Sequence, residues 1–81
     1  MNNSEKVNKV NEFITLKHKG MRVNLKAVLQ GVVLMSGRSG IIQHSGSLNV
    51  IKSDRRNVIL SDGKGHTLKL PVTSSRILSF V

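Results

Sequence analysis

The sequence predicts a mainly β fold: a small, strongly bent β-barrel of about five to six strands, preceded by an N-terminal helix or arm. Two observations lead to this prediction. From residue 20 onward, short apolar or alternating segments recur at close spacing, and residues that favour turns separate them. Near the same point, the hydrophobic period changes from about 3.6 residues to about 2. We therefore divide the chain into an N-terminal helix or flexible arm, residues 1–19, and a small β-barrel domain, residues 20–81.

The first element that we expect is a helix near residues 4–17. Ser4 can cap this helix, and apolar residues then recur every third or fourth position on one face: Val7, Val10, Phe13 and Ile14. Lys17 and His18 suit its C-terminal end, where cations interact favourably with the helix dipole, and Gly20 follows as a stop. Asparagines are frequent in the first eleven residues and disfavour a helix, so a frayed or disordered arm is the alternative.

The strands that we expect after the helix are short. Residues 21–27 alternate apolar and polar side chains, which is typical of a strand with one face in a core. Residues 32–35 form either a second strand or the continuation of the first one after a break at Gln30-Gly31. Glycines at 37, 40 and 46 predict a turn, a strand over residues 40–44, and another turn. The remaining strands are expected over residues 48–52, 57–60, 66–70 and 77–81.

Two further features concern the C-terminal part. Pro71, the only proline, should close the strand over residues 66–70 or lie on a sheet edge, because it cannot donate a backbone hydrogen bond. Residues 72–75 can then form a single helical turn before the last strand.

The charge balance indicates a polyanionic partner. The chain has 13 Lys and Arg residues against 4 Asp and Glu, a formal net charge of +9. No acidic residue lies between Phe13 and Ser53, a stretch that contains several Lys and Arg residues. A field of one sign favours nucleic acid as the partner. The alternative is a basic surface that only keeps the protein soluble.

We expect neither an enzyme nor a metal or cofactor site. The chain has no Cys, and its three His residues come from distant segments without the paired spacing of metal ligands. Gly63-Lys64-Gly65-His66-Thr67 lacks the glycine spacing and the Lys-Ser/Thr adjacency of a phosphate-binding loop. A Ser-His-Asp triad is recognised by its geometry, which the sequence does not supply.

Membrane insertion and secretion are also not expected. The longest mostly apolar run, residues 27–35, is much shorter than the roughly 20 residues that span a bilayer. No signal-peptide pattern follows the N-terminus. We therefore expect a cytoplasmic protein with no membrane partner.

A first resemblance is to KOW and related SH3-like barrels. Gly20-Met21-Arg22-Val23, followed by Gly37-Arg38-Ser39-Gly40-Ile41-Ile42, resembles their Gly-x-Arg-Val strand and their Gly-x-x-Gly-x-(Ile/Val) turn and strand. Residues 57–60, 66–71 and 77–80 are similar to their closing hairpin and last strand. The resemblance covers about residues 20–81. It implies an SH3-like barrel and, because members of these families often do so, binding to RNA or to transcription and translation machinery.

A second, weaker resemblance is to Sm-like RNA chaperones of the Hfq type. Gly46-Ser47-Leu48, Asp54 and Val58-Ile59-Leu60, after an N-terminal helix, are similar to that family's helix and its Gly-x-(Ile/Leu)…Asp…(Ile/Val)-x-Leu signature. The Lys-His pair of that family near the final strands is absent, and Thr73-Ser74-Ser75-Arg76 stands there instead. The resemblance therefore does not extend to the family's ring assembly and uridine pocket. Both resemblances imply a small bent barrel.

Nucleic acid should be bound through its phosphates. The chain has no Trp or Tyr, and Phe13 and Phe80 lie on apolar faces, so few side chains are available for base stacking. The first candidates for phosphate contacts are Arg22, Lys26, Arg38, Arg55 and Arg56. A second group of candidates is Lys17, Lys19, Lys52, Lys64 and Lys69. We expect these cations to gather on one side of the barrel, with Arg55-Arg56 at a hairpin end that can enter a groove.

The function that follows is a nucleic-acid-binding regulator or accessory factor, with RNA ahead of DNA as the ligand. The alternative is a basic protein-interaction module, an inhibitor or adaptor that docks on an acidic surface of transcription, translation or nucleoid machinery. Its docking face would be the apolar face of the helix. Exposed strand edges can also support a homo-oligomer.

Overall fold

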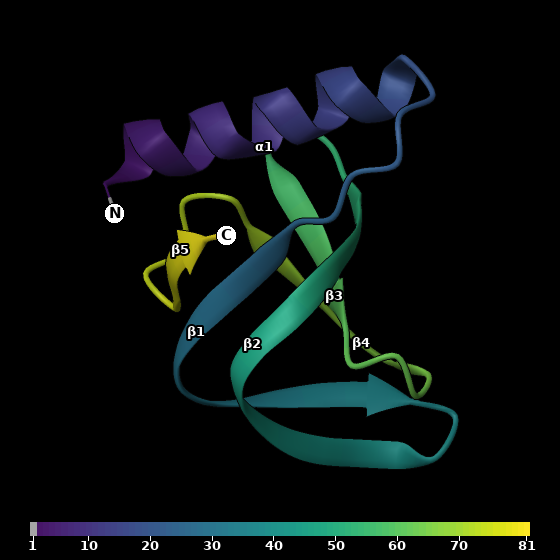
Figure 1. Ribbon diagram of the computed structural model, residues 1–81. Helices are drawn as coiled ribbons and strands as arrows, with labels where there is room; N and C mark the ends of the chain where they lie inside the picture. The colour runs from purple at the N-terminus through teal and green to yellow at the C-terminus, as the bar shows by residue number, and fades with distance from the viewer. Residues whose placement is uncertain (1) are drawn as a thin grey trace.

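The computed structural model describes residues 2–81, which form a closed barrel of four strands, one added strand and an N-terminal helix (Figure 1). The elements are helix α1 (Asn3–His18) and strands β1 (Lys26–Gly37), β2 (Gly40–Ser53), β3 (Asn57–Ser61), β4 (His66–Pro71) and β5 (Ile77–Phe80). The strands pair in the order β2-β3-β4-β1, a further β1–β2 pairing closes the ring, and β5 pairs with β1. All of these pairings are antiparallel. The predicted mainly β, strongly bent barrel with an N-terminal helix is confirmed.

The N-terminal segment is a helix and not a disordered arm. It begins earlier than predicted, because the side chain of Asn2 caps it in place of Ser4: Asn2 Oδ1 accepts a 2.8 Å hydrogen bond from the Glu5 N–H. Asn and Ser are comparable caps, so the sequence alone did not distinguish them. Gly20, with φ +80°, follows the helix as predicted. No helix in the described part of the chain is long and apolar enough to cross a membrane.

Helix and barrel share one hydrophobic core. In Figure 1, α1 lies across the upper end of the barrel. Val10 and Phe13 of α1 are buried, and Val7 and Ile14 pack partly against the same core. The strands supply the other large buried side chains, among them Val33, Met35, Val58, Leu60, Ile77 and Phe80. Because the apolar face of α1 is used in this core, it is not free to dock on an acidic partner.

Two long strands, β1 and β2, replace the several shorter strands that were predicted between residues 21 and 52. Residues 21–25 belong to no strand, so the prediction of a strand there is wrong, although Val23 and Leu25 still point toward the core. β1 then continues through the predicted break. Its register with β2 shifts between Leu29 and Val32, where Gly31 has φ +68°. A bulge of this kind bends a strand without ending its pairing.

The turn predicted at Gly46 is also absent. Gly46 has φ +97°, yet it lies inside β2 and pairs with Leu29 of β1. Two predicted strands are therefore one, because pairing with a continuous partner strand maintains β2 through the glycine. The predicted strand positions in the C-terminal half are confirmed to within a residue by β3, β4 and β5, and Pro71 ends β4 as expected.

The connection from β4 to β5 consists of turns and not the predicted helical turn. The Ser74 N–H donates to the Pro71 carbonyl at 3.0 Å, and the Ile77 N–H donates to the Ser74 carbonyl at 3.1 Å. The second turn starts where the first has ended, whereas a helical turn needs successive overlapping hydrogen bonds.

The glycine-rich turn between β1 and β2 is confirmed and contacts a second turn. Gly37 and Gly40 are the last paired residues of β1 and β2 and flank the turn residues Arg38 and Ser39. Gly40 has φ +106°. A Cβ atom on Gly37 would overlap the Gly65 carbonyl oxygen. Gly37 is therefore required for the close approach of two backbones, which brings the β1–β2 turn against the β3–β4 turn.

Candidate nucleic-acid interface

The Lys and Arg side chains of residues 2–81 are almost all exposed and have no acidic partner. Lys6 is the one that is buried. Within these residues, no Lys or Arg nitrogen lies within 4.0 Å of a carboxylate oxygen, and the carboxylate contact found within that distance joins Asp62 to the His66 ring. The Lys and Arg charges are therefore not neutralised by local pairs, and a net charge of +9 favours polyanionic partners over cationic ones.

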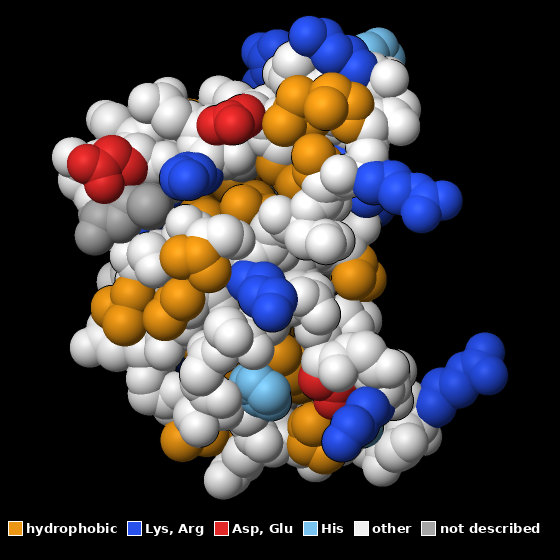
Figure 2. Space-filling model, in the orientation of Figure 1, with side chains coloured by type: hydrophobic (Ala, Val, Ile, Leu, Met, Phe, Trp, Pro, Cys, Tyr) orange, Lys and Arg blue, Asp and Glu red, His pale blue; other side chains and the backbone are white. Residues whose placement is uncertain are grey.

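The ten predicted phosphate-binding residues are exposed and fall into three groups. The corner group contains Lys17, Lys52, Arg55, Arg56 and Lys69. The connection group, from the end of α1 to the first residue of β1, contains Lys19, Arg22 and Lys26, and the tip group contains Arg38 and Lys64. In Figure 2, Lys and Arg side chains extend from the top, the centre and the right margin of one face. The expected gathering on one side of the barrel is thus replaced by separate groups, because the elements that carry these cations end at different places.

The corner group surrounds the C-terminal half of α1. One cavity of about 330 Å³ lies between the helix and the end of β2, and its lining residues are Phe13, Ile14, Lys17, His18, Ile51, Lys52 and Ser53. A neighbouring cavity of about 350 Å³ is lined by Asn11, Ile14, Thr15 and Arg55. Ile14 lines both cavities, so Lys17, Lys52 and Arg55 lie around one short stretch of helix. No acidic side chain lines either cavity.

The barrel register adds Lys69 to this group. Lys52 of β2 lies opposite Ile59 of β3, and Ile59 lies opposite Lys69 of β4. Directly opposed residues share a face of the sheet, so Lys52 and Lys69 are on the same outer face. Two strand spacings of about 4.8 Å separate their backbones by roughly 10 Å.

Asp54 holds the β2–β3 turn that presents the two arginines. Its Oδ1 atom accepts hydrogen bonds from the Asn57 and Arg56 N–H groups, each at 2.8 Å. These two bonds, the Asn57 bond first, hold the pKa of the Asp54 carboxyl below its ordinary value of 3.8, and the nearby charges of Lys69 and Arg56 act in the same direction. Sequence analysis missed this positioning role. The available signal was an Asp at the start of a turn, where its side chain commonly accepts backbone N–H groups.

A backbone contact fixes one of the two arginines further. The Arg56 carbonyl accepts a 2.8 Å hydrogen bond from the Val72 N–H, which ties the turn to the β4–β5 connection. The side chains of Arg55 and Arg56 remain exposed. The turn therefore combines a hydrogen-bonded backbone with two exposed guanidinium groups.

The tip group lies at the opposite end of β3. Asp62 supports the β3–β4 turn, since its Oδ1 accepts the Lys64 N–H at 2.7 Å and its Oδ2 lies 3.0 Å from His66 Nδ1. The Lys64 N–H bond is the main cause that lowers the pKa of Asp62 below 3.8. From Arg56 to this turn the chain advances about 3.3 Å per residue, so corner and tip groups are roughly 20 Å apart.

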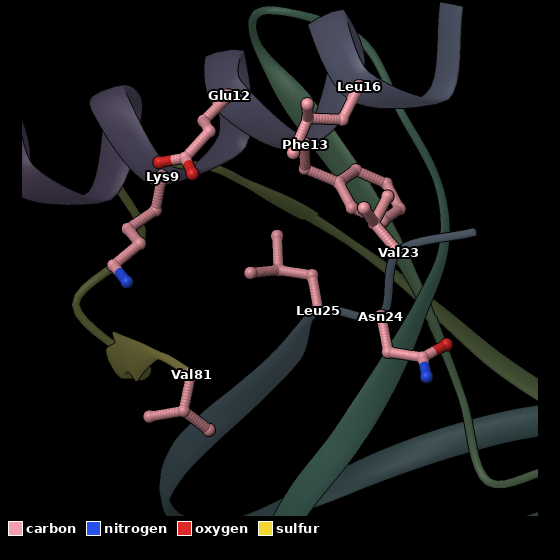
Figure 3. Close-up of a pocket in the computed structure, with 8 residues that line it drawn as sticks. All are labelled: Lys9, Glu12, Phe13, Leu16, Val23, Asn24, Leu25 and Val81. Atoms are coloured by element: carbon pink, nitrogen blue, oxygen red, sulfur yellow. The ribbon is translucent and has the colours of Figure 1, made fainter. Parts of the chain in front are cut away.

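A third cavity does not favour an anion. It has a volume of about 250 Å³ and opens between α1 and the start of β1 (Figure 3). Phe13, Val23 and Leu25 contribute apolar walls, while Lys9 and Glu12 extend from α1 on the same side of the cavity. Because these two charges have opposite sign, we do not include this cavity in the candidate interface.

The architecture is compatible with an SH3-like or Sm-like barrel. Comparison of the chain with models of protein families, with curated proteins and with solved structures found no match. No group of three or more His, Asp or Glu side chains that could hold a metal ion occurs in residues 2–81. The candidate interface therefore rests on the positions and charges of this chain's own residues.

Proposed function

We propose that the protein binds nucleic acid through phosphate contacts, RNA ahead of DNA, and acts as a non-enzymatic, cytoplasmic regulator or accessory factor. The observation that carries this proposal is the set of exposed Lys and Arg side chains with no carboxylate within 4.0 Å, throughout residues 2–81. Such cations can each replace a counterion of a phosphate. The preference for RNA rests on the resemblance to KOW and Sm-like barrels, whose members often bind RNA.

The corner group is the main contact surface in this proposal. It contains half of the ten candidate cations, and no acidic side chain lines its two cavities. Lys17 Nζ lies 5.5 Å from the centre of the Phe13 ring, which favours an ordered position for this ammonium group. Phe13 itself is 6% exposed, so its ring is not available to stack on a base. Phosphate contacts with little sequence preference are therefore the proposed mode of binding.

The tip group supplies a second contact to a long ligand. Its separation of roughly 20 Å from the corner group corresponds to the rise of about six base steps in a DNA duplex, at about 3.4 Å per step. A nucleic acid that reaches both groups should bind more tightly than a fragment that reaches one. A comparison of short and long oligonucleotides of the same composition tests this point.

The salt dependence of RNA binding is the decisive measurement. Fluorescence anisotropy with a labelled single-stranded RNA of mixed sequence gives the dissociation constant over a series of salt concentrations. If the five corner cations each contact a phosphate, the log–log slope should be about −3.5, at about 0.7 per contact. A slope near zero contradicts the proposal. Tighter binding to an acidic polypeptide, such as polyglutamate, than to RNA at the same salt would instead favour the adaptor function.

A further inference from the structure

The long hairpin formed by β1 and β2 is nearly uncharged. Between Ala27 and Ile51 the chain contains one Lys or Arg residue, Arg38, and no Asp or Glu. The protein as a whole has a formal charge of +9. The cations are therefore concentrated outside this hairpin, and a nucleic acid or an acidic protein finds almost no charge to bind on it.

One edge of this hairpin has no strand partner within residues 2–81. Residues 40–48 of β2 pair with β1 on one side, and the pairing of β2 with β3 begins only at Asn49. In Figure 1 this part of β2 runs along the lower margin of the molecule. In an antiparallel strand, alternate residues direct N–H and C=O groups away from the paired side, so this edge presents unpaired hydrogen-bonding groups. No Lys or Pro, which commonly protect exposed edges, occurs in these residues.

The outward face beside this edge is uncharged and carries three exposed apolar side chains among neutral polar ones. Val32, Leu34 and Ile41 are 61%, 57% and 70% exposed. The register places them on one face, because Val32 opposes Ser45, Leu34 opposes Gln43 and Ile41 opposes Ser36. Val33 and Met35, which alternate with the two β1 residues, point into the core. The edge and this uncharged face together form a neutral surface that can pair with another strand.

We propose that this edge joins two copies of the protein, with β2 antiparallel to β2 of the second copy about a twofold axis near Gln43. Two chains of +9 repel each other least where both are uncharged, and this hairpin is that region. Antiparallel pairing places the two Arg38 residues at opposite ends of the joint, roughly 33 Å apart at about 3.3 Å per residue. The twofold axis uses this edge in both copies, so no free edge of this kind remains in the dimer. Assembly through this edge therefore stops at two copies.

The mass in solution tests the proposal on protein freed of nucleic acid by nuclease and high salt. We expect sedimentation velocity to give a dimer of twice 8.9 kDa that dissociates on dilution. Ile41→Lys with Gln43→Lys places two cations on the edge and should give a monomer at the concentration where the unmodified protein is a dimer. Thr73→Lys with Ser75→Lys adds the same charge at exposed positions of the β4–β5 connection and should leave the dimer intact.

A cross-link tests the same contact without adding charge. The chain has no Cys, so Gln43→Cys introduces a single thiol beside the proposed axis. Opposed residues of paired strands have Cα atoms about 5.5 Å apart, within the range for a disulfide. Mild oxidation should convert most of this variant to a covalent dimer, while a Thr73→Cys control stays largely monomeric. A protein that is monomeric at all concentrations, a larger assembly unaffected by the edge lysines, or equal cross-linking of both Cys variants would each overturn the proposal. None of these measurements depends on RNA binding.

Discussion

The Nζ atom of Lys6 donates a 2.9 Å hydrogen bond to the carbonyl oxygen of Ser74, which lies 68 residues further along the chain. Lys6 belongs to the first half of α1 and is 5% exposed, whereas Ser74 is in the connection between β4 and β5. This hydrogen bond therefore attaches the N-terminal half of the helix to the β4–β5 connection, which is distant in sequence but lies beside α1 in the fold (Figure 1). The buried Val10 and Phe13 attach the middle of the helix to the same barrel.

Lys6→Ala should lower the free energy of unfolding by about 2 kcal/mol. The substitution removes a hydrogen bond from a charged donor, worth about 1.5–3 kcal/mol, and leaves the Ser74 carbonyl without this partner. Urea unfolding followed by circular dichroism measures the change. Lys9→Ala, one turn away and exposed, is the control and should change stability by less than about 0.5 kcal/mol. Equal effects of the two variants would contradict a specific role for Lys6.

Asp62→Asn should reduce the acid sensitivity of the fold. Because hydrogen bonds from the Lys64 N–H and from His66 lower the folded-state pKa of Asp62 below 3.8, the folded protein binds this proton more weakly than the unfolded chain. The resulting stabilisation is complete above pH 3.8 and is lost as the pH falls through the lower folded-state pKa. The urea midpoint of the unmodified protein should therefore fall more between neutral pH and this acid range than that of the variant. Parallel pH profiles would contradict this assignment.

Arg55→Glu with Arg56→Glu should weaken RNA binding by at least about tenfold at moderate salt. The loss of two phosphate contacts should also reduce the magnitude of the salt slope by about 1.4, at about 0.7 per contact. The matched control is Lys9→Glu with Arg76→Glu, which changes the net charge equally at exposed positions outside the ten candidate residues. If the control weakens binding as strongly, the whole charge of the protein and not the corner group determines affinity.

Asp54→Asn should strengthen RNA binding by about two- to fivefold. The Asn side-chain oxygen can still accept the Arg56 and Asn57 N–H groups, so the turn is preserved while one negative charge beside Lys69 and Arg56 is removed. A gain of this size corresponds to about 0.4 to 1 kcal/mol, the scale of an exposed ion pair. Anisotropy titrations at one salt concentration measure it. Weaker binding would show that the Asp54 charge itself is needed to position the arginines.

Gly37→Ala should lower the free energy of unfolding by about 2 kcal/mol or more, because the new Cβ would overlap the Gly65 carbonyl oxygen and both backbones must move apart. Ser36→Ala, at the neighbouring exposed position, is the control and should be nearly neutral. Urea midpoints of the two variants provide the comparison. An equally stable Gly37→Ala protein would mean that the two turns are not held together.

Local patterns in the sequence were sufficient for the fold class and for most elements. The three- and four-residue spacing of Val7, Val10, Phe13 and Ile14 predicted the helix, since one face of a helix must be buried. The glycine-rich turn between Gly37 and Gly40 was also predicted, whereas the structure shows which glycine serves which purpose: Gly37 permits close backbone approach and Gly40 has a positive φ. These features depend on neighbours within a few residues.

That β1 and β2 are each one continuous strand could not be predicted in the same way. Gly31 and Gly46 have the local signature of breaks, and each of them lies within a strand. The ladder between β1 and β2 extends past both positions because each strand supplies the hydrogen-bonding partners of the other. Long-range pairing of this kind overrides local turn preference.

By itself, the sequence determined that the protein is a basic, mainly β barrel with an N-terminal helix, because composition and hydrophobic period are properties of the chain. It also identified the exposed cations one by one. Only the tertiary structure decided which of them are neighbours: Lys17 and Lys52 line one cavity although 35 positions separate them, while Arg38 is at the other end of the barrel. The physical reason is that barrel closure and helix packing set the distances between side chains that are far apart in the sequence. These distances cannot be read from local sequence patterns.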